Sequence, residues 1–244
     1  MRIGSLTNGS NLKGPVADAF AEHGTWVRVS IDGWDDASYM ENRKVKSGEF
    51  GQVIDNMRDF VRRDSRCVLG VSFIIGENNA GHIYDVCRMM KELGADHVKL
   101  AAAVISNEGK ENNRYHQAFA ATAKPEIEKA LALRDGNFDV LDHYHEAEER
   151  FDKDYEICPF LQFLTVIGAD CNVYTCQDKA YTDSGLLGSI KDRRFKEFWF
   201  SDENLKRLYA VNPSQDCQHH CVTHAKNLAV FEALKLDPDH GVFV

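Results

Sequence analysis

The sequence lacks any long hydrophobic run, and this excludes two classes of protein. No apolar stretch reaches the roughly 20 residues that a helix needs to cross a bilayer. The N-terminal segment MRIGSLTNGSNL has no apolar core of the kind found in a secretory signal peptide. From the sequence alone we therefore expect a cytoplasmic protein.

Positive charge is also scarce. The 244 residues include 29 Lys and Arg against 38 Asp and Glu, which gives a formal net charge of −9. This balance disfavours nonspecific binding to nucleic acid or to an anionic membrane, so we expect neither as a partner. Low-complexity segments and repeats longer than one strand–helix unit are absent too. A hydrophobic content of 43% can supply a real core.

The first hundred residues alternate between two patterns. Apolar or β-branched runs bounded by turn residues predict strands, and apolar residues at helical spacing predict helices. The run CVLGVSFII is nearly all apolar, as expected of a strand that is buried on both faces. The alternation predicts parallel βα units. The predicted strands are 2–7, 26–31, 67–75 and 97–105, and the predicted helices are 12–23, 50–63 and 83–93.

The rest of the chain changes in character. Residues 106–157 are polar, with a predicted helix at 116–133 and a strand near 138–141. Residues 158–244 contain two short β-like runs, 163–167 and 172–176, around a turn. We place a boundary near 150–157 and expect three parts: 1–110, 111–157 and 158–244. The charged cluster Asp142, His143, His145 and Glu146 is expected to be a solvated face.

Polar residues follow the predicted strands. They are Thr7 with Asn8, Ser30 with Asp32, the segment 77–79, and Lys99. Ligands of parallel α/β folds bind beyond the carboxyl ends of the strands, although Asn and Asp there also serve as turn formers and caps. Ser30 and Asp32 share one face of their strand. Lys99 lies within a buried strand and therefore needs a partner or a ligand.

Seven cysteines in a cytoplasmic chain point to metal rather than to disulfides. Cys158 and Cys176 bracket the predicted hairpin, while Cys217 and Cys221 form a C-x3-C pair. Four thiolates suit zinc or an iron–sulfur cluster, and spacing alone does not choose between them. The C-x3-C spacing is wider than the C-x2-C of zinc ribbons, which favours a cluster.

The remaining cysteines and the nearby histidines have simpler interpretations. Cys67 and Cys87 are expected in the core because they lie in a buried strand and on the apolar face of a helix. Cys171 stands where a tight hairpin favours Gly, and we do not expect it to be a ligand. The three histidines His219, His220 and His224 are possible substitute ligands, but we expect them to be solvent-exposed.

Taken together, these segments resemble radical S-adenosylmethionine (SAM) enzymes that carry a SPASM or twitch auxiliary-cluster domain. The family pattern at the hairpin is Cys, about a dozen residues, Gly, four residues, Cys, and Cys171 replaces the Gly here. The resemblance rests on SLTNG (5–9), VRVSIDG (27–33), GVSFIIGENN (70–79), DHVKL (96–100), CPFLQFLTVIGADCNVYTC (158–176), LLGSI (186–190), FKEFW (195–199) and CQHHCVTHAKN (217–227).

The resemblance implies an α/β fold: a partial parallel (βα) barrel followed by a small α+β cysteine-rich domain. It implies that Cys158, Cys176, Cys217 and Cys221 hold one auxiliary [4Fe–4S] cluster. It also implies an oxidoreductase or maturase that acts on a peptide or small molecule through a 5′-deoxyadenosyl radical. The residues that it places around SAM are Thr7, Asn8, Ser30, Asp32, Ile75, Asn78 and Lys99.

One departure from the family is large. The C-x3-C-x2-C motif that holds the SAM-cleaving cluster, and the glycine-rich motif that binds the methionine part of SAM, do not occur in the sequence. We expect SAM binding only if a missing N-terminal segment or a partner chain completes the barrel. Of these two explanations we favour the first, a truncated sequence. The alternative is a noncatalytic metal-binding module, with iron–sulfur or zinc, that retains a SAM- or peptide-binding cleft. No catalytic residue can be named.

Overall fold

The computed structural model of the chain describes residues 2–106, 109–144, 151–217 and 219–235. The chain forms two compact units. The first comprises residues 1–105 and 111–147, and the second comprises residues 106–110 and 148–244. None of the described helices is long and apolar enough to cross a membrane.

The first unit is built on a five-stranded sheet in the order β1-β2-β3-β4-β5, and every neighbouring pair is parallel. The predicted strands are thus confirmed, with ends that differ by a few residues. Because all the strands run the same way, their carboxyl ends meet at one edge of the sheet. The strands are Gly4–Thr7 (β1), Trp26–Ser30 (β2), Val68–Ile75 (β3), His97–Ala102 (β4) and Asp139–His143 (β5).

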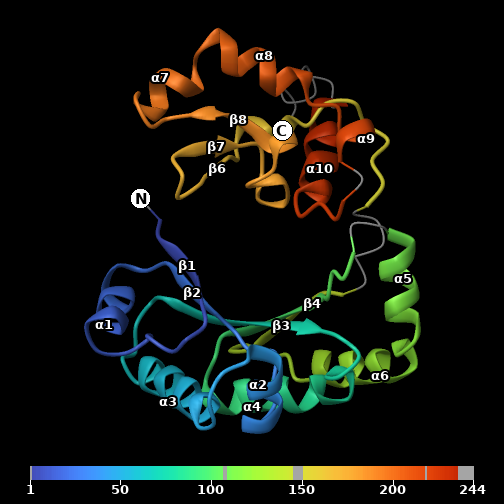
Figure 1. Cartoon of the computed structure of the whole chain (residues 1–244). Helices are drawn as coiled ribbons and strands as arrows, with labels where there is room; N and C mark the ends of the chain where they lie inside the picture. Colours follow the sequence, from blue (N-terminus) through green and yellow to red (C-terminus); the bar gives the residue numbers. More distant parts are fainter. Residues whose placement is uncertain (1, 107–108, 145–150, 218, 236–244) are drawn as a thin grey trace, which may run out of the picture. The chain divides into compact units, whose positions relative to one another are not determined.

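Helices connect these strands, and α3, α4 and α6 lie against one face of the sheet (Figure 1). The end of α4 shows how the sequence sets a boundary: Gly94 follows the helix at φ 99°, a conformation that glycine adopts without strain. The helices are Gly14–His23 (α1), Asp36–Arg43 (α2), Glu49–Val61 (α3), Ile83–Leu93 (α4), Gly109–Gln117 (α5) and Ala120–Leu131 (α6).

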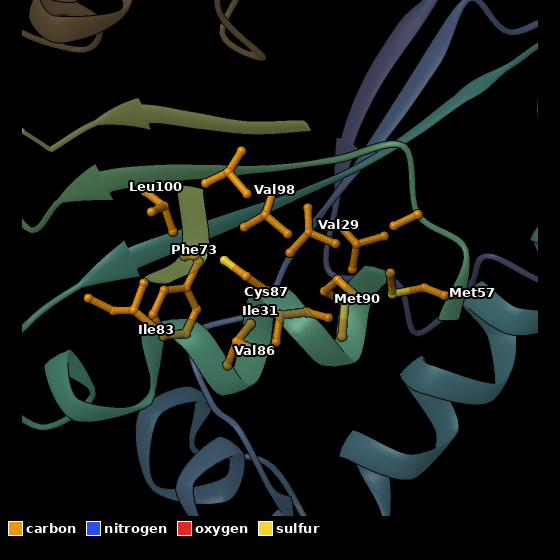
Figure 2. Close-up of a cluster of buried hydrophobic side chains, with 14 of the residues drawn as sticks. Val29, Ile31, Met57, Phe73, Ile83, Val86, Cys87, Met90, Val98 and Leu100 are labelled. Carbon is orange, nitrogen blue, oxygen red and sulfur yellow. The ribbon is translucent and has the colours of Figure 1, made fainter. Parts of the chain in front are cut away.

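The core lies between the sheet and these helices (Figure 2). Alternate residues of the strands point into it: Val29, Phe73 and Val98 are fully buried and meet the apolar face of α4. Cys87 on α4 is fully buried as well, and Cys67 is 4% exposed, so both predicted core cysteines are confirmed. Full burial of a Val or Phe side chain contributes about 1.5–3 kcal/mol to the free energy of unfolding. This burial fixes which face of each strand packs on the helices and which face turns away from them.

Two helical features differ from the sequence-based prediction. The predicted helix 116–133 is two helices, because the backbone of Phe119 leaves the helical region between α5 and α6. The helix α2 was not predicted, since its residues are mostly polar. A capping box signals it in retrospect: the Asp35 carboxylate accepts a hydrogen bond from the Ser38 amide, and the Ser38 hydroxyl accepts one from the Asp35 amide.

The second unit contains an antiparallel three-stranded sheet in the order β6-β7-β8. The predicted strand 163–167 is shorter than expected, because residues before it form a 3-10 turn at Pro159–Gln162. A small core of Leu161, Val173, Leu187, Phe198 and Leu208 joins the sheet to the helices. The elements are Val166–Ile167 (β6), Asn172–Tyr174 (β7), Leu186–Ser189 (β8), Phe195–Trp199 (α7), Asp202–Ala210 (α8), Pro213–Asp216 (α9) and His224–Lys235 (α10).

Candidate metal centre and strand-end pocket

The four cysteines singled out in the sequence line one pocket of the second unit. Each stands at a junction between elements. Cys158 precedes the 3-10 turn, and Cys176 follows β7. Cys217 ends α9, where its amide donates to the carbonyl of Pro213, and Cys221 precedes α10. The fold therefore brings together two pairs that are about forty residues apart in the sequence.

The thiols are held in apolar surroundings. Burial raises the pKa of Cys217 to about 11 and also raises the pKa of Cys158 and Cys176. The apolar part of the lining includes Leu161 and Val211. A thiolate in such a place is unfavourable unless a cation accompanies it, and metal binding supplies that cation while releasing the protons. The pocket is thus suited to soft-metal ligation by sulfur.

The separation of the donor atoms distinguishes two kinds of centre. Among the described residues, the group of three potential ligands whose atoms all lie within 4.8 Å of one another is Cys176, Asp178 and His219, with no three of the cysteines grouped so closely. A single tetrahedral zinc with bonds of about 2.3 Å needs sulfurs about 4 Å apart. A [4Fe–4S] cluster spreads its thiolates more widely, because each one ligates a different iron.

The histidines near Cys217 are less exposed than the sequence suggested. His224 is 8% exposed, and its Nδ1 lies 3.1 Å from the Tyr155 hydroxyl. His220 is half-buried, with its ring edge against Phe151. The Nε2 atom of His219 is buried without a hydrogen-bond partner in the described part of the chain. Burial lowers the pKa of His219 to about 4, so this imidazole is neutral and able to ligate a metal.

The polar residues of this pocket that were not found from the sequence include Lys153, Lys179 and Asn227. Asn227 is fully buried, and its amide donates to Cys158 Sγ at 3.2 Å and accepts from the Phe160 amide at 3.0 Å. Both lysines are buried as well. In the sequence these three residues are polar side chains next to apolar or cysteine-bearing segments. Polar residues in such positions are common on protein surfaces, so the sequence does not mark them as buried.

Cys171 lies outside this lining, as the sequence analysis expected for a residue that is not a ligand. It is exposed, at the turn between β6 and β7, and its φ is 61°. The left-handed region favours glycine because it has no Cβ. This geometry gives a physical reason to expect Gly at this position of the hairpin.

The strand ends of the first unit form a second pocket. It contains two of the predicted residues, Asp32 and Asn78, together with Ile74 and Tyr115. Asp32 forms an ion pair with Arg43 at 2.5 Å and accepts from the Ile74 amide at 3.2 Å. Burial raises the pKa of Asp32, while Arg43 and the Ile74 amide act in the opposite direction.

Asn79, which belongs to the polar strand-end segment 77–79 but not to the residues expected around SAM, also lines this pocket. It is 5% exposed, and its Nδ2 donates to the carbonyls of Ile74 at 2.9 Å and Asp32 at 3.3 Å. Its Oδ1 accepts from the Gly76 amide at 2.8 Å. One buried side chain therefore connects the ends of β2 and β3.

The other predicted residues of the first unit lie elsewhere. Thr7 and Asn8 cap the turn after β1, with their side chains accepting from the Gly9 and Ser10 amides. The Ile75 side chain belongs to the core and is fully buried, whereas that of Ile74 is 41% exposed on the opposite face. Asp142, His143, His145 and Glu146 were expected to form a solvated face. Asp142 and His143, at the end of β5, are instead half-buried, and His145 and Glu146 lie outside the described residues.

Ser30 and Lys99 share a row on the sheet face opposite the helices. Their strands are both in register with Ser72 of β3, which places the three residues side by side. Lys99 is half-buried and has a partner in the structure, as a Lys within a strand requires. In the next row, Arg28 Nη2 approaches His97 Nε2 to 3.4 Å across Gly70, where a Cβ would lie 2.4 Å from the imidazole.

The parallel five-stranded sheet with helices on one face, followed by a small antiparallel sheet, is the partial-barrel fold of radical SAM proteins. The fold class predicted from the sequence is confirmed. No protein-family model matches the chain, and no curated protein matches it.

The chain is similar in fold to several solved structures, among them those of anSMEcpe and SuiB. For anSMEcpe with bound AdoMet the TM-score is 0.54 at 16% identity, covering 95% of this chain and 72% of that one. For SuiB of Streptococcus suis bound to S-adenosylmethionine the TM-score is 0.53 at 12% identity, covering 84% of this chain and 48% of that one. Other structures hold anSMEcpe with a Kp18Cys peptide and SuiB with its precursor peptide SuiA. At these identities the likeness is one of fold.

Proposed function

We propose that this chain is the C-terminal part of a radical SAM iron–sulfur enzyme, an oxidoreductase or maturase that acts on a peptide or small molecule. One observation carries the proposal: Cys158, Cys176, Cys217 and Cys221 line a single apolar pocket in a chain with the radical SAM fold. Four converging thiols are the donor set that an iron–sulfur cluster requires.

The residues present fit an auxiliary [4Fe–4S] cluster. Among the described residues no three of these thiols all lie within 4.8 Å of one another, and Asn227 donates to the sulfur of Cys158. Amide donors to cluster sulfurs are one of the ways in which a protein sets a cluster's potential. When bound, such a cluster supplies one-electron redox chemistry.

The strand-end pocket is our proposed place for SAM. Asp32 offers an acceptor suited to ribose hydroxyls, and Ile74 offers an apolar surface beside it. Asn78 lines the same pocket, and we keep Thr7, Asn8, Ser30 and Lys99 as predicted neighbours of the ligand. Ile75 is withdrawn from this set, because its side chain is fully buried in the core on the other face of the sheet. The cysteines of the SAM-cleaving cluster would come from a further N-terminal segment or a partner chain.

A peptide is the substrate class that we favour. Two of the similar solved proteins were determined with peptides, Kp18Cys for anSMEcpe and SuiA for SuiB. We extend this to the present chain by analogy of fold.

Anaerobic purification and reconstitution with iron and sulfide test the cluster. We expect a brown protein whose iron and sulfide contents correspond to one [4Fe–4S] cluster per chain. Cys158→Ala and Cys217→Ala should each lose most of the iron, whereas Cys171→Ala, a matched exposed control, should retain it. A colourless protein with stoichiometric zinc, or full iron in both ligand variants, would overturn the proposal.

A second candidate function is a noncatalytic module that binds zinc. It is favoured by Cys176, Asp178 and His219, whose donor atoms lie within 4.8 Å of one another, and by the unpartnered Nε2 of His219. Cysteine, carboxylate and neutral imidazole are all zinc ligands. His219→Gln separates the two functions: it should abolish stoichiometric zinc binding if this candidate is right, and leave cluster assembly intact if the first is.

A further inference from the structure

The sheet face of the first unit that turns away from the helices carries a cation with no carboxylate beside it. Arg28 of β2 is half-buried, and in the described part of the chain it forms no ion pair. Its Nε atom is buried and has no hydrogen-bond partner among the described residues. Burial lowers the pKa of Arg28, and no carboxylate of those residues opposes this effect. A guanidinium in such a place is costly unless an anion accompanies it.

Two carboxylates lie near the neighbouring His97, and both are engaged elsewhere. Asp139 of β5 is in register with His97, but its carboxylate forms an ion pair with Arg134 at 3.0 Å. Asp96 accepts from a backbone amide of β3 at 2.6 Å. Both carboxylates act on the pKa of His97, whereas neither acts on that of Arg28. The charge of the guanidinium is therefore available to a ligand.

Two glycines shape the surface around Arg28. Gly70 lies between Arg28 and His97, and its missing side chain lets Nη2 of the arginine approach Nε2 of the imidazole to 3.4 Å. The ring of Trp26 lies across Gly4, where a Cβ would come within 2.0 Å of the indole. The guanidinium carbon of Arg28 is 5.6 Å from the centroid of this ring. An indole and an imidazole therefore flank the guanidinium.

Exposed apolar side chains adjoin this cation on the same face. Leu6 of β1 is in register with Arg28 and is 67% exposed, while Val68 of β3 is in register with Trp26 and is 38% exposed. Residues in register on parallel strands point to the same face of a sheet. A small inorganic anion would leave these side chains in water, whereas an organic acid would cover them.

We propose that Arg28 and His97 form a binding site for a carboxylate that carries an apolar group, either the C-terminal carboxylate of a peptide or a small organic acid. The guanidinium fork matches a carboxylate through two parallel hydrogen bonds. Leu6, Trp26 and Val68 offer the apolar contact. The inference goes beyond the proposed function, because it requires neither a bound cluster nor SAM.

Titration of the full chain, followed through the NMR signal of the Trp26 indole N–H, tests this site. The probes are 3-phenylpropanoate and acetyl-alanyl-phenylalanine, each compared with its amide, and inorganic phosphate, in a buffer free of other carboxylates. Arg28→Gln keeps hydrogen-bond donors but removes the charge, and Arg28→Lys keeps the charge but removes the fork. Arg66→Gln, at an exposed arginine of the same unit, is the control. Trp26→Phe identifies the indole signal.

We expect both acids to shift the indole signal saturably, with a dissociation constant of about 1 mM or below for ligands of this size. The amides and phosphate should bind about tenfold more weakly or not at all. Arg28→Gln should weaken the binding of the acids about tenfold or more, Arg28→Lys should weaken it less, and Arg66→Gln should leave it unchanged. Tighter binding of the peptide acid identifies a peptide terminus as the source of the carboxylate, and equal or weaker binding identifies a small acid.

The absence of a saturable shift with either acid overturns the inference. So does binding of the amides or of phosphate as tight as that of the acids, and so does unchanged binding in Arg28→Gln. This variant should fold like the wild type, because no carboxylate of the described residues depends on its charge. Failure of Arg28→Gln to fold would show a structural role for the guanidinium and would also overturn the inference. Protein that binds the acids but assembles no cluster overturns the proposed function alone.

Discussion

Asn227 on α10 donates a hydrogen bond to the sulfur of Cys158, at 3.2 Å, across nearly seventy residues of sequence. The same side chain accepts from the Phe160 amide at 3.0 Å, so it fixes both the thiol and the turn that follows it. Since Asn227 is fully buried, water cannot replace these bonds if the side chain is lost.

Replacement of Asn227 by Ala removes the acceptor of the Phe160 backbone amide. It should therefore lower the free energy of unfolding of the second unit by about 1–3 kcal/mol, the cost of leaving a buried hydrogen-bond donor unsatisfied. Urea unfolding monitored by circular dichroism measures the change, and the exposed Gln215→Ala on α9 is the matched control. A change of stability no larger in Asn227→Ala than in the control would contradict the structural role given to this amide.

Cys171→Gly should stabilise the protein. The residue holds φ 61°, a conformation that costs a side-chain-bearing residue about 1–2 kcal/mol, while glycine loses about 0.5–1 kcal/mol of that gain through the entropy of the unfolded chain. We expect a net gain of about 0.5–1 kcal/mol in the free energy of unfolding. Iron content should not change, because Cys171 does not line the metal pocket. Lower stability of the Gly variant would show that the thiol makes a compensating contact.

The seven cysteines should differ in their reaction with iodoacetamide. In the native protein Cys171 should be alkylated first, because it is exposed. Cys87 should stay unmodified until the protein unfolds, since it is fully buried and burial raises its pKa to about 12. Peptide mass spectrometry after timed labelling measures the order.

The same labelling experiment tests the four cysteines of the pocket, by comparing their alkylation with and without iron. With the cluster assembled they should resist alkylation, and after chelation of the iron they should react more slowly than Cys171 because their thiols are partly buried. Equal labelling of these four with and without iron would contradict their assignment as ligands.

Asp32 should give the first unit a specific pH dependence. Burial raises its pKa in the folded state, so the folded protein binds this proton more tightly than the unfolded chain. The contribution of Asp32 to the free energy of unfolding therefore falls as the pH rises from about 4 through the raised folded-state pKa. Asp32→Asn removes this titration.

The difference in unfolding free energy between wild type and Asp32→Asn, measured by urea titration at several pH values, should accordingly shift in favour of the variant as the pH rises. The loss of the Arg43 ion pair adds an offset to the variant, but the titration of Asp32 sets the slope of the difference. A difference that is constant, or that moves toward the wild type with increasing pH, would show that Arg43 outweighs burial.

Much of the fold follows from local patterns. The run 67–75 is apolar enough to predict a strand buried on both faces, and β3 occupies Val68–Ile75. The helix 83–93 has an apolar stripe and a terminal Gly, and α4 has those same ends. The cysteine spacing indicated the four thiols that line one pocket, and the place of Cys171 in a tight hairpin, where Gly is favoured, set it apart from them.

Local patterns could not predict the helix formed by the polar residues of α2, and they could not predict which face of each strand is buried against the helices. The helix α2 has too few apolar residues for a periodic signal, and its capping box is visible only once Ser38 is placed against Asp35. Alternation along β3 puts Ile74 and Ile75 on opposite faces, but which of them is buried depends on where the helices pack.

The sequence by itself determined the parallel α/β plan and indicated the four cysteines that line one pocket, because both depend on residue type and short-range spacing. Only the tertiary structure decided what surrounds those donors. Asn227 and Lys153 reach the pocket from segments about seventy residues apart. Their roles come from burial, which turns ordinary polar side chains into fixed dipoles and charges beside the cysteines.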